Sequence, residues 1–343
     1  MQQTQLKPGN LLNSKGYLNQ AGYATELIKT YNRNQIKSSK LRIKEWDYYL
    51  VYNKDFGIAL TIADNGYMGL ISASFLDFIS GETQTVSPML LMPLGKLDLP
   101  PSSEVGDIHF KNKQFEIHFT HEGNSRRLKL NMPKFHKQSS FYIDVMLTPT
   151  LKESIVIATP FSKKSKAFYY NQKIIGMRAS GNVNYKNKYY VFNPEESFGI
   201  LDWGRGVWTY NNTWYWGAAN GILNGDIFGF NIGYGFGDTS SATENMLFYN
   251  GAHKLNHVTF HIPENPDGTP DYLSPWKFTS SDNRFQADFF PILDRSAYTS
   301  FGILLSDQHQ VFGHFTGTVV LDSGETINFE NILGFAEKVK NKW

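Results

Sequence analysis

Short apolar runs alternate with turn residues from Leu41 to the C-terminus of the chain. The runs include WDYYLVYN, FGIALTIAD, RLKLNMPKF and HVTFHIP, and Gly, Asn, Asp or Pro bounds each of them. A turn about every 8–12 residues is typical of successive antiparallel strands and hairpins. The best helical candidate, ATELIKTYNR, is short. The pattern therefore predicts an all-β protein with no helix longer than about 15 residues.

A β meander of this length is expected to close on itself. Open sheets leave unpaired edges that promote aggregation, and barrels remove those edges. The 343 residues also exceed the size at which a single hydrophobic core stops growing, about 250–300 residues, so two cores are expected. Residues 1–40 are polar and predict an irregular N-terminal arm, with one helical turn at residues 24–31.

Residues 199–250 concentrate Trp, Gly and isolated charges. Trp214 and Trp216 point to the same face of an extended segment, because side chains in a strand alternate with period two. The frequent Gly residues favour bulges and close approach of chain or ligand. Such a face predicts an apolar cavity wall, and core packing of the same indoles is the alternative. The candidate wall residues are Trp203, Trp208, Tyr210, Trp214 and Trp216.

Five polar side chains interrupt this apolar stretch, namely Asp202, Arg205, Asn231, Asp238 and Glu244. A charge removed from water costs several kcal/mol unless it is paired, so Arg205 is expected to be buried against Asp202, Asp238 or Glu244. One interpretation is an internal ion-pair network that stabilises a barrel. The other is a catalytic site, in which Asp202 or Glu244 is a general acid with a pKa raised by apolar surroundings and Arg205 orients it.

Composition argues against several classes of function. The 33 Lys and Arg residues against 31 Asp and Glu give a formal charge of +2, which is too small to attract nucleic acid. The absence of Cys excludes disulfides, thiol catalysis and thiolate metal sites. No run of about 18 apolar residues and no secretory signal occur, so we expect a cytoplasmic protein without an integral membrane segment.

Motifs for metal, cofactor or serine-hydrolase chemistry are also missing. Three of the nine His residues, His109, His118 and His121, could meet across a hairpin, yet no HExxH or comparable ligand spacing is present. GYGFGD lacks the βαβ context of a dinucleotide site, and no GxSxG elbow occurs. The sequence therefore predicts neither a metal site nor a cofactor, and it does not indicate the oligomeric state.

Several strings of the chain resemble a known family. DWGRGVW, NIGYGFGD, TENMLFYNG, HQVFGHFTG and the C-terminal GFAEKVKNKW are similar to domain-of-unknown-function family 2804 from about Leu41 to Trp343. More distantly, the layout resembles the lipocalin-like hydroxyneurosporene synthase group. That resemblance implies two lipocalin-like β-barrel or half-barrel units packed together, spanning residues 41–244 and 245–343. It also matches Glu337 in GFAE to the end of the second unit.

The leading hypothesis is a protein that binds an apolar polyene, isoprenoid or lipid-like molecule in an aromatic-lined barrel cavity, and that hydrates, isomerises or cyclises it. A non-catalytic lipocalin-like carrier is the first alternative. A carbohydrate-active protein is the second, because Trp and Tyr also stack on sugars and paired carboxylates suit glycosidic chemistry. The candidate catalytic residues are Asp202, Arg205 and Glu244, and the candidate ligand-binding residues are the five aromatic residues above with Asn231, Asp238 and His309.

Overall fold

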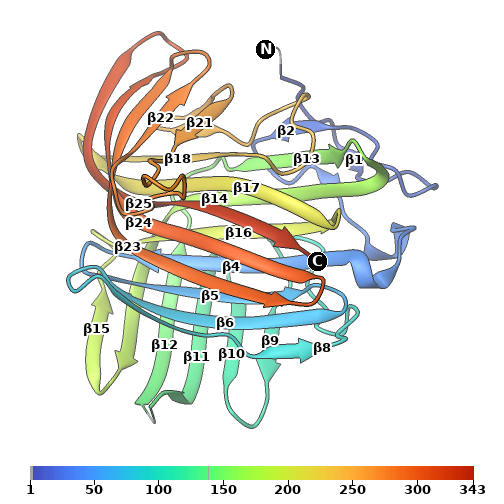
Figure 1. Cartoon of the computed structure of the whole chain (residues 1–343), viewed down its shortest axis with the longest axis horizontal. Helices are drawn as coiled ribbons and strands as arrows, with labels where there is room; N and C mark the ends of the chain where they lie inside the picture. Colours follow the sequence, from blue (N-terminus) through green and yellow to red (C-terminus); the bar gives the residue numbers. More distant parts are fainter. Residues whose placement is uncertain (1–2, 138) are drawn as a thin grey trace.

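The computed structural model describes residues 3–137 and 139–343 of the chain. The regular structure of this part is almost entirely β, and its helical segments are two short turns, η1 (Arg33–Gln35) and η2 (Lys40–Arg42). The prediction of an all-β protein without long helices is therefore confirmed. Two large curved sheets stack on each other, with the sheet of β4, β5 and β6 below the sheet of β17, β24 and β25 in Figure 1.

The first sheet has 14 strands and comes mainly from the first two thirds of the chain. Its strands follow in the order β7 (Glu82–Val86), β6 (Met68–Asp77), β5 (Phe56–Asp64), β4 (Ile43–Tyr52), β16 (Phe198–Val207), β14 (Lys164–Tyr185), β12 (Ser139–Thr148), β11 (Ser125–His136), β10 (Glu116–Glu122) and β9 (Ile108–Lys111). Four shorter strands extend it, namely β2 (Gly22–Ala24), β8 (Met89–Leu91), β13 (Ile155–Phe161) and β15 (Lys188–Phe192).

The second sheet has nine strands from the last third of the chain. Their order is β20 (Ala252–Lys254), β19 (Met246–Phe248), β18 (Asp226–Tyr234), β17 (Asn211–Leu223), β25 (Thr326–Lys342), β24 (Leu304–Val320), β23 (Phe285–Phe301), β22 (Trp276–Ser280) and β21 (Val258–His261). The chain passes from one sheet to the other between Val207 and Asn211, which is well before the boundary expected at residue 244.

The N-terminal arm is irregular, but the helical turn expected at residues 24–31 is wrong. That segment contributes β2 to the first sheet and also β3 (Lys29–Thr30), which pairs in parallel with β1 (Gly9–Asn10). The physical reason is pairing, because β2 completes its backbone hydrogen bonds against β13, and tertiary pairing overrides a weak local helix preference.

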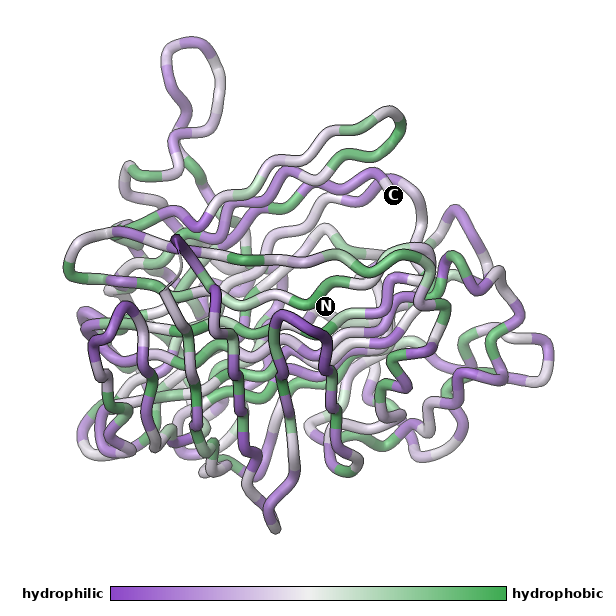
Figure 2. The backbone as a smooth tube through the Cα atoms, turned by 90° about the horizontal axis from the view of Figure 1, so that it is seen from below, coloured by the Kyte–Doolittle hydropathy of each residue, from purple (hydrophilic) through white to green (hydrophobic). Residues whose placement is uncertain are grey.

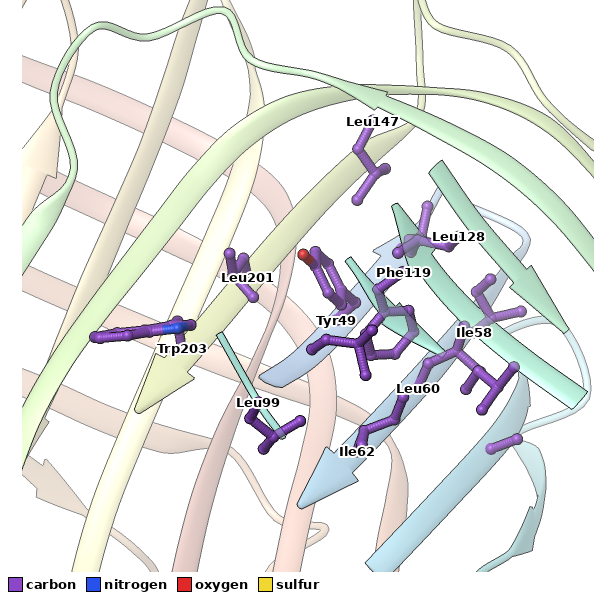
Figure 3. Close-up of a cluster of buried hydrophobic side chains, with 14 of the residues drawn as sticks. Tyr49, Ile58, Leu60, Ile62, Leu99, Phe119, Leu128, Leu147, Leu201 and Trp203 are labelled. Atoms are coloured by element: carbon purple, nitrogen blue, oxygen red, sulfur yellow. The ribbon is translucent and has the colours of Figure 1, made fainter. Parts of the chain in front are cut away.

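Three hydrophobic cores stabilise this arrangement. One fills the concave side of the first sheet, where Leu201 of β16 is in register with Tyr49 and Tyr49 with Leu60, and Trp203 lies further along β16 (Figure 3). A second fills the second sheet around Trp276. The third core lies between the two sheets and packs side chains of β4, β5, β13 and β14 against those of β17, β24 and β25. The aromatic residues of the chain are therefore divided among three interiors, and the third positions the site described below.

A bulge in β14 bends the sheet beside that third core. The register between β14 and β16 shifts between Ile174 and Met177, and Gly176 has a φ of 72°, a left-handed conformation that favours glycine. Its N–H donates a hydrogen bond of 2.8 Å to Asn220 Oδ1 of the other sheet. The bulge therefore anchors the two sheets to each other close to Lys173. Among the residues described, no helix has the length and apolar character needed to cross a membrane.

Candidate functional site

A cavity of about 180 Å³ lies between the two sheets, next to the third core. It is not inside either curved sheet, so the expected barrel cavity is corrected to an inter-sheet cavity. The first two cores fill most of the space enclosed by the curved sheets. The cavity is lined from the first sheet chiefly by Trp46, Tyr48, Tyr169, Lys173 and Asp202, and from the second sheet by Trp214, Trp216, Arg295, Gln310 and Glu337.

Two rows of cross-strand neighbours face each other across this cavity. In the first sheet Lys173 is in register with Asp202, Asp202 with Tyr48 and Tyr48 with Thr61. In the second sheet the row runs through Trp216, Glu337, Gln310 and Arg295. Directly opposed residues on antiparallel strands point to the same face. Strand register therefore gathers polar side chains from distant parts of the sequence into one site.

Lys173 is the cation at the centre of the site. Its Nζ lies 2.8 Å from Asp202 Oδ2, and both side chains are largely buried. The same Nζ lies 3.7 Å from the ring centroid of Trp216, which adds a cation–π contact from the opposite sheet. The other Asp202 oxygen accepts a hydrogen bond of 2.6 Å from Asn171 Nδ2. Asp202 is therefore paired with a buried lysine and hydrogen-bonded to a buried amide.

Glu337 has a different environment, because all its hydrogen-bond donors are neutral. Trp214 Nε1 donates to Oε1 at 2.9 Å and Gln310 Nε2 donates to Oε2 at 3.0 Å. Burial raises the pKa of Glu337 to about 7, although the Trp214 hydrogen bond and the charges of Lys173 and Arg295 oppose the rise. A carboxyl group with this pKa exchanges a proton near neutral pH, as a general acid must.

Glu244 brings a third carboxyl group to the cavity. Its Oε2 accepts a weak hydrogen bond of 3.3 Å from Asn231 Nδ2, and Asn231 Oδ1 accepts one of 2.7 Å from Trp216 Nε1. Burial raises the pKa of Glu244, and the nearby Lys173 opposes that rise. Gly233 leaves room for this carboxyl, since a Cβ there would lie 2.6 Å from Glu244 Oε1.

Two tyrosines complete the polar surface of the cavity. Tyr48 donates a hydrogen bond of 3.1 Å to Gln310 Oε1 and so connects the two sheets through Gln310 to Glu337. Burial raises its pKa to about 12, so its hydroxyl keeps its proton. Burial and the charges of Asp202, Glu244 and Glu337 raise the pKa of Tyr169 well above its ordinary value. The hydroxyl of Tyr169 therefore lies within electrostatic reach of all three carboxyl groups.

Some buried polar atoms of lining residues lack a hydrogen-bond partner within the described chain. Both side-chain polar atoms of Asn341 and the indole N–H groups of Trp208 and Trp343 belong to this set. A buried polar group without a hydrogen bond lowers stability by about 1–3 kcal/mol. We therefore expect each of these atoms to bind an ordered water or a bound molecule.

Arg205 is buried, as its Trp flanks predict, but the predicted partner is wrong. Its Nη2 lies 2.9 Å from Asp47 Oδ1, and its other donors reach the carbonyls of Trp46 and Pro100. Residues 202 and 205 are an odd number of positions apart on one strand, so their side chains lie on opposite faces of β16. Arg205 therefore belongs to the interior of the first sheet, away from Asp202.

Trp203 shares the Arg205 face and is fully buried in the core of the first sheet, so it does not line the cavity (Figure 3). Tyr210 is exposed and donates a hydrogen bond to the carbonyl of Ile303. Asp238 accepts a hydrogen bond of 3.0 Å from Ser240 N in a surface turn.

His309 is directed away from the cavity, because its neighbour Gln310 takes the inward position on β24. Its Nδ1 lies 2.6 Å from Asp294 Oδ2, and its ring stacks on Tyr272.

Trp208, Trp214 and Trp216 line the cavity together with Asp202 and Glu244, and Asn231 lies buried behind Trp216. The predicted shared face of Trp214 and Trp216 is confirmed.

Sequence reasoning missed Lys173, Gln310, Tyr48 and Tyr169, and it noted Glu337 only through family resemblance. Lys173 lies in NQKIIG, where an apolar run follows a lone cation on a long strand. A single charged residue within an apolar run indicates a candidate site residue. The same pattern identifies Asp202 as a candidate.

One group of three potential metal ligands occurs in the described chain, far from the cavity in the first sheet. His109 and His118 are in register on β9 and β10, and their Nε2 atoms lie 3.0 and 2.9 Å from Glu116 Oε1. Lys111 Nζ already lies 2.9 Å from the other Glu116 oxygen. His121 of the same hairpin is directed elsewhere, to the carbonyl of Ser103.

Comparison with known proteins gives a family and a fold. Residues 2–343 match the family described as "Domain of unknown function (DUF2804)". An AttH candidate from Nitrosomonas europaea superimposes with a TM-score of 0.56 at 11% identity, covering 87% of this chain and 92% of that chain. Kievitone hydratase from Nectria haematococca gives 0.51 at 11% identity, covering 98% of both chains. No curated protein matches the sequence. The lipocalin-like fold expected from the sequence is confirmed.

Proposed function

The chain belongs to the DUF2804 family, and from the geometry of its cavity we propose that it binds and protonates an apolar, unsaturated small molecule between its two sheets. The observation that carries this proposal is Glu337, a buried carboxyl with a pKa of about 7 in an aromatic cavity. Apolar lining with a few convergent polar groups is typical of a small-molecule site. A group with a strongly perturbed pKa in such a cavity is a candidate catalytic residue.

The proposed step begins with transfer of the Glu337 proton to a carbon–carbon double bond of the ligand. This transfer leaves a carbocation on the ligand and a carboxylate on Glu337. The rings of Trp214, Trp216 and Tyr48 line the same space, and aromatic rings stabilise nearby positive charge. Addition of water, with transfer of one of its protons to the Glu337 carboxylate, gives a hydrated product. Loss of a different proton of the ligand to the same carboxylate gives an isomer, and attack by a second double bond followed by such a proton loss gives a ring. One structural relative is a hydratase, which accords with the first outcome.

The dimensions of the cavity limit what enters it. A cavity of about 150 Å³ accepts benzene, so the 180 Å³ here accommodates one ring or a short unsaturated segment. A long polyene would enter with one end only and leave the remainder outside. The unpartnered polar atoms of Asn341, Trp208 and Trp343 favour a ligand that also carries an oxygen atom, such as a hydroxyl or carbonyl group.

A carrier without catalysis is the second candidate, and a specific observation favours it. Both Glu337 oxygens accept hydrogen bonds from Trp214 and Gln310, and Asp202 is paired with Lys173. These contacts stabilise each sheet internally, and the Tyr48–Gln310 hydrogen bond and the Lys173–Trp216 contact hold the two sheets together, so the same residues also suit a purely structural role. The two functions differ in whether the Glu337 proton moves to the ligand.

Deuterium exchange distinguishes the two functions. The protein is incubated in D₂O with a set of small unsaturated alcohols of the isoprenoid type, and mass spectrometry measures deuterium in the recovered molecules. Reversible protonation of a double bond introduces deuterium at carbon. We expect exchange with the wild type and its loss in Glu337→Gln, while tryptophan quenching shows that binding persists.

Glu330→Gln provides the matched control, because Glu330 is exposed on the same strand. It should exchange like the wild type. Exchange that persists in Glu337→Gln would refute the assigned acid, and ligand quenching without exchange in any form of the protein would favour the carrier.

A further inference from the structure

Exposed apolar side chains gather beside two half-buried residues of the cavity lining, Trp343 and Leu70. Around them lie six exposed residues that we name the apolar rim: Leu41, Leu91, Met92, Tyr210, Phe301 and Ile303. Leu91 is 88% exposed, Phe301 80% and Ile303 76%, and a group of exposed apolar side chains in one region marks a candidate interaction surface.

Backbone contacts connect the rim to the cavity on the side of the second sheet. The N–H of Trp343 donates a hydrogen bond of 2.9 Å to the carbonyl of Tyr210. Tyr210 in turn donates its hydroxyl hydrogen to the carbonyl of Ile303. The tip of the β23–β24 hairpin therefore lies directly beside a residue that lines the cavity.

The first sheet supplies the other side of the rim. Leu70 of the cavity lining is in register with Met89 of β8, and Met68 with Leu91. The N–H of Met92 donates a hydrogen bond of 2.9 Å to the carbonyl of Tyr67. Lys44 Nζ lies 4.5 Å from the ring centroid of Tyr67 and 5.7 Å from that of Trp343, so the two halves of the rim are near each other.

The rim consists of projecting tips and not of a flat face. Figure 1 shows the β23–β24 hairpin, the C-terminus and β8 on the same side of the molecule. The hairpin tip beside the C-terminus is strongly hydrophobic in Figure 2. Projecting apolar tips suit insertion into a soft apolar phase, whereas a second rigid protein surface would require a matching groove.

Basic side chains border the same region. Arg42 donates a hydrogen bond to the carbonyl of Trp208, and Lys342 is in register with Asn211 and Leu305. Lys340 lies two residues before Lys342 on β25, and it is in register with the acidic residue Asp307. Cations next to exposed apolar tips are the combination that binds anionic lipid surfaces.

We propose that the apolar rim docks the protein on a membrane surface that contains anionic lipid. The hairpin tip and β8 enter the boundary between headgroups and acyl chains, and the lysines contact the headgroups. The side of the cavity lined by Trp343 and Leu70 then faces the bilayer, where apolar molecules dissolve. The evidence for docking is the set of exposed apolar and basic residues. Only the uptake of substrate from the bilayer rests on the proposed function.

Sedimentation with lipid vesicles tests this inference. The full chain is mixed with vesicles of phosphatidylcholine containing about a quarter phosphatidylserine, or of phosphatidylcholine alone. We expect the wild type to bind the anionic vesicles more strongly. Ile303→Ser should weaken binding roughly tenfold, since it removes one buried apolar side chain from the bound state. Lys340→Gln with Lys342→Gln should remove most of the preference for anionic lipid.

Ile79→Ser is the matched control, because Ile79 is also 76% exposed but follows the opposite end of β6. It should bind vesicles like the wild type, and so should Glu337→Gln, which separates docking from catalysis. Equal losses in Ile303→Ser and Ile79→Ser would overturn the proposal. Absence of vesicle binding by the wild type would overturn it too, as would sedimentation velocity showing that the rim forms a dimer that excludes lipid.

Discussion

The protonation state of Glu337 has a direct consequence for stability. Its pKa in the folded chain is about 7, against an ordinary value of 4.5. Between these two pH values the folded chain keeps a proton that the unfolded chain has lost. The free energy of unfolding therefore falls as pH rises from about 4.5 to about 7, and it stays low above that interval. This contribution is fully present only below the ordinary pKa of the group.

The size of the effect follows from the same interval. Each pH unit changes the free energy of unfolding by about 1.4 kcal/mol, so the whole interval amounts to about 3 kcal/mol. Glu337→Gln removes the titration but keeps the shape of the side chain. At low pH the free energy of unfolding of the variant should be about 1 kcal/mol lower than that of the wild type. The reason is that the introduced amide group contacts the side-chain amide of Gln310. Above about pH 7 it should equal or exceed the wild type in stability.

Urea unfolding of both proteins at about pH 5 and pH 8 measures this change. The quantity of interest is the difference in unfolding free energy between wild type and variant, since other titrating groups contribute equally to both. We expect that difference to change by about 3 kcal/mol in favour of the variant as pH rises. Glu330→Gln should show no such change. If wild type and Glu337→Gln follow parallel curves, Glu337 is ionised in the folded chain and the reasoning is refuted.

Two further substitutions test the packing on the two faces of β16. Arg205→Met should cost about 3–5 kcal/mol in thermal or urea unfolding, since it leaves the buried Asp47 carboxylate unpaired, and an unchanged melting temperature would contradict the ion pair. Gly204→Ala should destabilise the sheet and disturb ligand binding, because the new Cβ would lie 1.9 Å from the ring of Trp46; a variant with wild-type stability and quenching would show that Trp46 moves freely.

Local patterns were sufficient to predict the strands and the shared face of Trp214 and Trp216. Both depend on period-two alternation over a few residues. The same alternation places Asp202 and Arg205 on opposite faces of β16, so the sequence itself argues against their pairing. The sequence also predicts that Gln310 and His309 point in opposite directions, but not which of them points inward.

The composition of the site depends on sheet order, which local patterns do not contain. Lys173, Asp202 and Tyr48 become neighbours because β14, β16 and β4 are adjacent in the first sheet. Glu337 reaches them only because the second sheet stacks on the first. These contacts span most of the chain, and no short segment carries a signal for them. For the same reason the cavity was expected inside a barrel and is found between the sheets.

The central claim is that Glu337 carries a proton in the folded protein at neutral pH. Infrared spectroscopy observes the carbonyl band of a protonated carboxyl group directly. The difference spectrum between wild type and Glu337→Gln should contain that band at about pH 6, and it should disappear with a midpoint near pH 7. A difference spectrum that shows only carboxylate bands at about pH 6 would contradict the account.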